Sequence, residues 1–196
     1  FALSLVISPW LAGWIGLPGL FFFTAVLALG GMAVVRWSVP DEPYTLAPSD
    51  RSGLAEVVRD SGLMRLNFGV FILHAVQLAM WVAIPAMLVQ AGLDKLDHWQ
   101  IYLPAVVASF VVMGAVFAME RLGFLRAAFL AAVAMIAVVQ LALLWVASIT
   151  PSLHSLSALL FLFFCGFNAL EATMPSLTSR LAPPASRGAA MGLYNP

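Results

Sequence analysis

Long apolar stretches without a charged side chain are the feature that most limits what this chain of 196 residues can fold into. Four of them occupy residues 1–35, 66–93, 98–119 and 127–170. Each is longer than the roughly 20 residues that a helix needs to cross a bilayer. Because lipid offers the backbone no hydrogen-bond partner, such stretches must form helices or a closed barrel. The short alternating segments of barrel strands are missing here, so we expect an all-α, polytopic membrane helix bundle.

Composition excludes several other classes of protein. Charged residues make up 9% of the chain and hydrophobic residues 63%, whereas a soluble domain is roughly 25% charged. Nine Lys and Arg residues balance nine acids and form no basic cluster, which argues against a nucleic-acid partner. The one cysteine, Cys165, excludes a disulfide scaffold, and the three scattered histidines lack metal-ligand spacing. We therefore expect neither a metal nor a cofactor.

A polar, proline-rich segment divides the chain into three parts. In residues 1–37 we expect the tail of one span over 1–12, broken at Ser8-Pro9 and closed by the stretch from Gly13 to Gly19 with its turn at Pro18-Gly19. A complete span over 18–37 then follows. In residues 38–65 we expect a linker that ends in a short amphipathic helix, whose residues at helical spacing are Leu54, Val57, Val58 and Ser61. Residues 66–196 then predict four spans and the start of a fifth, at 66–90, 99–119, 126–147, 154–178 and 188–196.

The positions of the basic residues predict the orientation of these spans. Eight fall on one side of the expected membrane, namely Arg36, Arg51, Arg59, Arg65, Arg121, Arg126, Arg180 and Arg187. Only Lys95 falls on the other side. Since Lys and Arg near span ends stay in the cytoplasm, we expect the linker 38–65 to be cytoplasmic. The opposite ends carry an expected aromatic belt of Trp10, Trp14, Trp99, Tyr102 and Trp145.

Glu171 is the one acid inside an expected span. An ionised carboxylate in lipid costs about 3 kcal/mol or more, so we expect this side chain to be protonated or paired. One interpretation is a proton carrier that loads and releases as water access alternates; the other is a structural or gating pair with Arg180 or an arginine of another helix. Asn168, on the same helix face, either bonds this acid or a substrate, or joins two helices.

A polar and aromatic stripe marks the first span after the linker. Asn67, His74 and Trp81 recur every seven residues, and Gln77 lies beside them. Such a face has no reason to contact lipid. We expect Asn67, Gln77 and Trp81 to line a substrate cavity, with His74 as a proton relay or a hydrogen-bond partner for substrate. The alternative is a neutral His74 bonded to a neighbouring helix, with Trp81 serving only in packing.

Several short segments resemble the major facilitator superfamily, and in particular its YajR-type bacterial branch. They are Leu66-Asn67-Phe68-Gly69, Leu73-His74, Ile84-Pro85, His98-Trp99 with Tyr102-Leu103, Phe167-Asn168-Ala169-Leu170-Glu171-Ala172, Pro175-Ser176-Leu177 and Gly188-Ala189-Ala190-Met191-Gly192-Leu193-Tyr194. The long linker between groups of short-looped helices also fits a two-lobed carrier. The resemblance implies a parent of twelve helices, of which this chain would be a central fragment: the end of helix five, helix six, the linker, helices seven to ten and the start of helix eleven.

The same resemblance implies a cytoplasmic gate. A degenerate copy of the superfamily loop motif G-x-x-x-D-R-x-G-R-R is present as Glu120-Arg121-Leu122-Gly123, followed by Arg126. By this analogy Glu120 and Arg121 would help lock the outward-facing state through ion pairs between helices, with Gly123 as the glycine of the motif. A solvated loop without such pairs is the alternative.

The function implied is secondary active transport of a small organic molecule in a bacterial inner membrane, by alternating access and with proton-coupled efflux favoured. The expected partners are the substrate, protons, the lipid bilayer and the missing N-terminal lobe of the same chain. A uniporter and a non-transporting scaffold remain alternatives. A membrane-embedded enzyme is disfavoured because such chemistry needs clustered acids, histidines or a metal at one depth, so we expect no catalytic residue.

Overall fold

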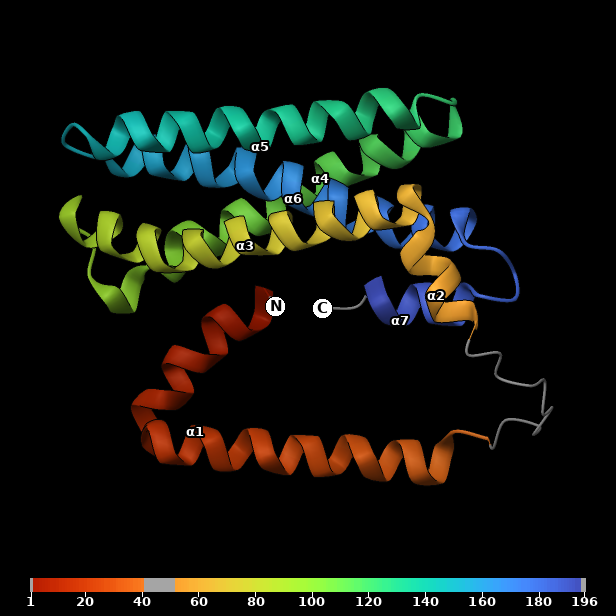
Figure 1. Cartoon of the computed structure of the whole chain (residues 1–196). Coiled ribbons are helices and arrows are strands. Elements are labelled where there is room, and N and C mark those ends of the chain that lie inside the picture. Colours follow the sequence, from red (N-terminus) through yellow and green to blue (C-terminus); the bar gives the residue numbers. More distant parts are fainter. Residues whose placement is uncertain (1, 41–51, 195–196) are drawn as a thin grey trace. The chain divides into compact units, whose positions relative to one another are not determined.

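The computed structural model describes residues 2–40 and 52–194 of the chain. Within these residues the regular structure is helical and no strand occurs. The chain divides into two compact units, Phe1–Ser49 and Asp50–Pro196, which are described separately here (Figure 1). The expected all-α membrane helix bundle is confirmed.

The first unit contains one long helix, α1, over Ala2–Ser38. This helix has one break, at Gly16, where φ is 67° and ψ is 176°. Glycine adopts this conformation without steric cost because it has no Cβ. The expected break at Ser8-Pro9 is wrong, since the helix continues through Pro9. The helix does break within the expected stretch from Gly13 to Gly19, but at Gly16 and not at Pro18-Gly19.

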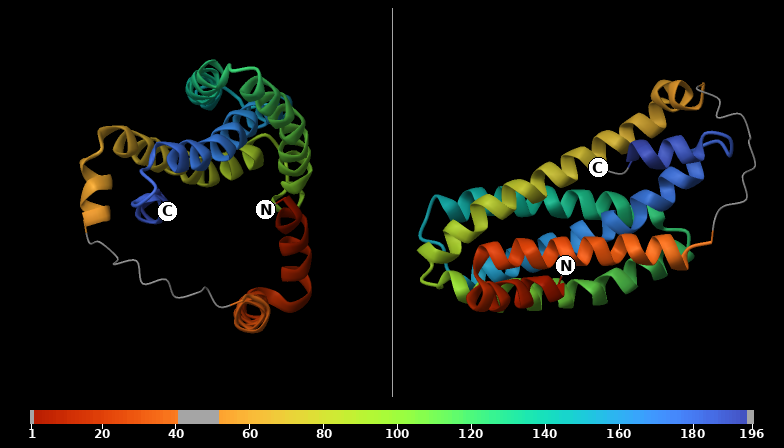
Figure 2. Two further views of the ribbon diagram at one scale, coloured as in Figure 1. Left: turned by 90° about the vertical axis from the view of Figure 1, so that its right-hand side faces the viewer. Right: turned by 90° about the horizontal axis from the view of Figure 1, so that it is seen from below.

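The second unit is a bundle of long helices with two short helices at one end (Figures 1 and 2). Its elements are α2 Ser52–Arg59, α3 Ser61–Gln90, a 3-10 turn Lys95–Asp97, α4 Trp99–Arg121, α5 Leu125–Ala147, α6 Leu153–Leu181 and α7 Arg187–Tyr194. Helix α6 lies at the centre, because it packs against α3, α4, α5 and α7. The bundle therefore depends on the apolar surface of α6.

Local sequence signals explain where several of these helices begin. Asp60 caps α3, because its Oδ1 accepts hydrogen bonds from the backbone N–H groups of Gly62 and Leu63. The amphipathic helix was expected to continue past this point, and this is wrong: α2 ends at Arg59, and Ser61 is the first residue of α3. Ser152 opens α6 with a capping box in which Ser155 is the reciprocal partner.

The long helices are apolar on their outer faces as well as in the core. The buried residues of α5 recur every three or four positions and so form one face: Ala128, Ala132, Ile136, Val139, Leu143 and Val146. Other helix faces expose large apolar side chains, such as Val82 and Val111, each 79% exposed. Of the described residues, five helical segments are long and apolar enough to cross a membrane: Trp10–Ser38, Ser61–Gln90, Lys95–Arg121, Leu125–Ala147 and Leu153–Leu181.

Gly166 allows α6 to pack closely against α5. A Cβ at this position would lie 2.9 Å from Cγ1 of Ile136 and 3.1 Å from the backbone oxygen of Ala132. Both neighbours belong to the buried face of α5, which has little room to move. The close approach of small residues is how helices gain packing contacts in lipid, where no hydrophobic force draws them together.

We predict that Gly166→Ala destabilises the protein by about 1–3 kcal/mol, because the added methyl group overpacks the interface between α5 and α6. Thermal unfolding of the purified protein in detergent measures the change. Gly114→Ala is the matched control, since a Cβ at Gly114 meets no atom within 4 Å. Equal melting temperatures for the two variants would contradict this description of the interface.

Candidate functional site

His74 of α3 and Glu171 of α6 meet across two helices. Nε2 of His74 lies 3.3 Å from Oε1 of Glu171, and the two side chains are 28% and 38% exposed. This separation suits an ion pair, although the atoms are not aligned as a hydrogen bond and Oε1 makes none within the described residues. Tyr194 of α7 lies within electrostatic range of the same carboxyl group. The two residues that were singled out as candidate proton carriers are thus neighbours.

The backbone of α3 determines which ring nitrogen of His74 faces the acid. Nδ1 lies 3.0 Å from the backbone oxygen of Val70, one turn earlier. A carbonyl oxygen can only accept, so we assign the proton to Nδ1. In the neutral ring, Nε2 then presents a lone pair to Glu171. An attractive contact consequently needs one more proton, carried either by the carboxyl group or by Nε2.

Arg180 pairs with Glu120 and not with Glu171. Its Nη2 lies 2.8 Å from Oε1 of Glu120, which joins the last turns of α6 and α4. The interpretation that paired Arg180 with Glu171 is therefore wrong. The physical reason is the helix geometry, since Arg180 lies nine residues beyond Glu171, or about 13 Å along α6.

The expected gate motif lies around this ion pair. Glu120 and Arg121 line one pocket together with Phe117 and Arg180. Gly123 follows in the turn to α5 with a φ of 85°, a conformation that favours glycine. Glu120 thus pairs with a residue of another helix, Arg180 of α6, and the role of this pair in a gate stays a prediction.

Asn168 joins α6 to α4. Its amide nitrogen donates to Oγ of Ser109 at 2.7 Å, and that hydroxyl donates in turn to the backbone oxygen of Val106 at 2.6 Å. Ser109 is fully buried. The geometry corresponds to the helix-to-helix interpretation of Asn168. Sequence reasoning missed Ser109, because a serine in an apolar span is usually satisfied by its own helix backbone.

The remaining residues of the stripe on α3 lie along one side of that helix. Trp81 stacks on Tyr102 of α4, with ring centroids 5.1 Å apart and planes inclined by 29°. Gln77 lines a small pocket beside both rings. Asn67 is different, because both polar atoms of its amide are buried and make no hydrogen bond with any residue that the structure describes. Tyr102 was expected in an interfacial belt but is buried at this stack.

The described residues hold no group of three or more His, Cys, Asp and Glu side chains that would bind a metal ion. The groups that the site offers are a carboxyl group in contact with an imidazole, aromatic rings and amides. Among the side chains named so far, only His74 and Glu171 form a titratable pair within the expected spans. Such a site can bind, release and position a proton or a small molecule.

Comparisons with known proteins agree with this architecture. The chain matches the Major Facilitator Superfamily over residues 1–196. It is 33% identical over 201 aligned positions to the inner membrane transport protein YajR of Escherichia coli (strain K12), a match that covers 100% of this chain and 43% of that protein. It is 24% identical over 200 positions to the uncharacterized transporter BU466 of Buchnera aphidicola subsp. Acyrthosiphon pisum (strain APS), covering 100% of this chain and 51% of that protein. No solved structure matches.

The chain thus spans about half the length of the curated relatives that it matches. Both relatives are named as transporters, which supports the expectation that the protein is not an enzyme. The name of the first relative also supports a multi-pass protein of the bacterial inner membrane. The match over every residue, together with the apolar helix bundle, shows that the chain belongs to the Major Facilitator Superfamily.

Proposed function

We propose that this chain belongs to a secondary active transporter that moves a small organic molecule by alternating access and is coupled to protons. The observation that carries the proposal is the contact between His74 and Glu171. It places two titratable groups on different helices, within spans where an unpaired charge is expensive. The family and the names of the relatives support the transport part of the proposal.

The pair would link protonation to helix movement. While Nδ1 of His74 is held by Val70, a bound proton makes the contact with Glu171 attractive in either of its forms. Loss of that proton leaves a carboxylate facing a nitrogen lone pair, and the contact becomes repulsive. Since His74 lies on α3 and Glu171 on α6, release of the proton favours separation of these helices.

The ion pair of Glu120 and Arg180 would act as a gate on the cytoplasmic side. The basic residues at the ends of α1, α4 and α6 support that orientation, and with it a cytoplasmic linker at 38–65. The pair joins α4 and α6 at their ends, so it can form in one state and break in the other. Its contribution is modest because Arg180 is 62% exposed.

The side chains along α3 favour a neutral or cationic substrate with a flat apolar part. Glu171 of α6 supplies an acid next to this face of α3. No Lys or Arg lies within residues 66–90, 99–119 or 154–178 to bind an anion. Capture of a carboxylate or phosphate usually relies on arginine. Trp81, whose ring is backed by the buried Tyr102, would offer an aromatic surface beside the amide of Gln77. Exchange of such a molecule for an inward-moving proton would give efflux.

Two alternative functions, a uniporter and a non-transporting scaffold, make different predictions. A uniporter needs no titrating group in its spans, so it predicts that removing the Glu171 carboxyl group leaves transport and its pH dependence unchanged. A non-transporting scaffold predicts that no solute crosses when the protein is reconstituted in proteoliposomes. The contact of His74 with Glu171 favours the proton-coupled carrier over both.

We predict that Glu171→Gln abolishes a pH-dependent infrared band of a protonated carboxyl group in reconstituted membranes. His74→Asn should keep that band but shift it, because the carboxyl group loses its ring partner. Infrared difference spectra recorded during a pH titration need no knowledge of the substrate. Glu56→Gln makes the same chemical change in the linker helix and serves as the control. A Glu171→Gln spectrum identical to that of the unmodified protein would reject the role of this pair.

We predict that Glu120→Arg opens the cytoplasmic pocket and that the double variant Glu120→Arg with Arg180→Glu closes it again. The measurement is the rate at which a membrane-impermeant maleimide labels a cysteine in place of Phe117, which lines the pocket. An exposed pair contributes at most about 1 kcal/mol, so the expected acceleration is about fivefold or less. If the double variant labels as fast as the single one, the ion pair is not a gate.

A further inference from the structure

The linker helix α2 packs against α3 and α7 at one end of the second unit. Val57 of α2 is 1% exposed and belongs to a buried cluster with Leu63, Ala182 and Ala190. These four residues come from α2, α3, the end of α6 and α7. An amphipathic helix that lay only on the membrane surface would bury its apolar face in lipid headgroups. Here part of that face is buried in protein.

The junction between α2 and α3 is a single residue, Asp60. Its N–H donates to the backbone oxygens of Glu56 and Val57, while its side chain caps α3 through Gly62 and Leu63. The hydrogen bonds of Asp60 therefore join the end of α2 to the start of α3. These hydrogen bonds leave little freedom between the two helices, and α2 packs against α7 as well as α3.

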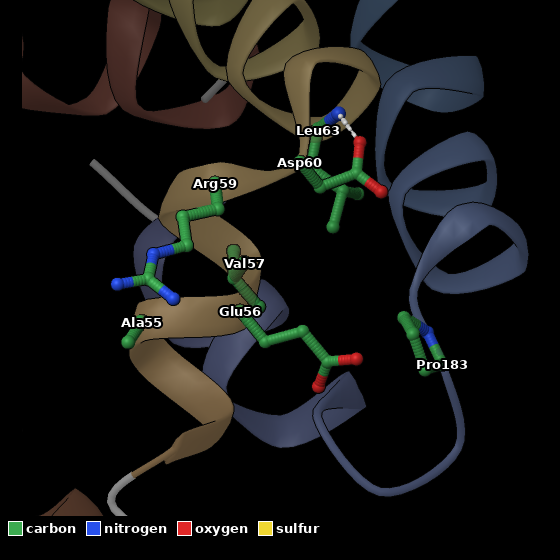
Figure 3. A pocket seen from close by; sticks show the side chains of 7 residues that line it. All are labelled: Ala55, Glu56, Val57, Arg59, Asp60, Leu63 and Pro183. Atoms are coloured by element: carbon green, nitrogen blue, oxygen red, sulfur yellow. Dashed lines mark hydrogen bonds between the residues drawn. The ribbon is translucent and has the colours of Figure 1, made fainter.

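Figure 3 shows the seam between α2 and the connection from α6 to α7. Val57, Leu63 and Pro183 line a pocket there of about 440 Å³. The carboxyl groups of Glu56 and Asp60 extend toward Pro183, whereas Arg59 points away from it. The polar side of α2 thus borders the connection, and the apolar contact through Val57 holds the two segments together.

The α6 side of this contact lies next to the proposed gate. Ala182, in the buried cluster, follows Arg180 by two residues, and Arg180 bonds Glu120 at 2.8 Å. We propose that α2 is a strap that holds the end of α6 and keeps Arg180 in position for Glu120. The docked strap favours the state in which this ion pair is formed. This inference rests on the gate proposed above, but its tests measure docking and hydrogen exchange, so they can fail while transport and proton coupling still hold.

A disulfide tests whether the strap is docked. A Cβ at Gly53 would lie 3.7 Å from Cβ of Ser186, and the Cβ atoms of a disulfide are about 3.8 Å apart. We predict that Gly53→Cys with Ser186→Cys forms a disulfide readily in the intact protein in membranes. Leu54→Cys with Ser186→Cys is the matched control, because Leu54 is exposed and should not cross-link. The native Cys165 is buried about 24 Å from the end of α6 and does not compete. Equal cross-linking of both pairs, or of neither, would overturn the docking.

A second measurement tests whether the docked strap holds the gate. Val57→Asp should place a charge in the buried cluster, lower the yield of the 53–186 disulfide, and speed hydrogen exchange of residues 178–182 by roughly tenfold. Val58→Asp is the control, since Val58 is 50% exposed. Oxidising the disulfide in the Val57→Asp protein should restore slow exchange. Val57→Ala serves as a milder variant if Val57→Asp does not fold.

The contrary outcome is clear for each variant. If Val57→Asp or Val57→Ala lowers the disulfide yield while exchange at 178–182 stays the same, α2 does not hold the end of α6. If oxidation of the disulfide in the otherwise unmodified protein speeds exchange there, the strap must release, and the proposal is wrong.

Discussion

Lipid cannot hydrogen-bond, and this constraint governs each polar group of the bundle. The hydroxyl of Thr173 donates to the backbone oxygen of Ala169, and that of Thr178 donates to that of Met174. Some groups that their own helix does not satisfy find partners on another, as Asn168 does at Ser109 and Glu171 at His74, whereas the buried amide of Asn67 makes no hydrogen bond with the described residues. Because such contacts are few, each one specifies which helices are neighbours and at which depth.

These contacts all involve α6. It meets α3 at Glu171, α4 at Asn168, and α4 again at Arg180, while α5 approaches closely at Gly166. A helix that is held by apolar packing on one side and by titratable or ionic pairs on others can respond to a proton without unfolding. The proposed proton coupling, gate and strap therefore all act on α6, the central helix of the bundle.

The fold class was readable from the sequence, whereas the partners were not. Charge-free stretches predicted the spans, because the cost of a charge in lipid acts on each residue separately. Glu171 stood out for the same reason. The partner of Glu171 could not be predicted in the same way, because its contact with His74 depends on how two helices far apart in sequence pack. From the sequence alone, Arg180 was an equally open choice. Gly16 was one of three glycines in a short stretch, and only backbone geometry distinguishes it.

The protonation state of His74 tests the central claim most directly. Nitrogen-15 NMR of histidine-labelled protein in bilayers, with His74 assigned from the His74→Asn variant, reports each ring nitrogen separately. The account predicts a proton on Nδ1 throughout, and an Nε2 signal that changes with pH and changes differently in Glu171→Gln. A neutral ring with its proton on Nε2 and none on Nδ1 would contradict this account. So would an Nε2 signal that stays the same when the pH changes and in Glu171→Gln.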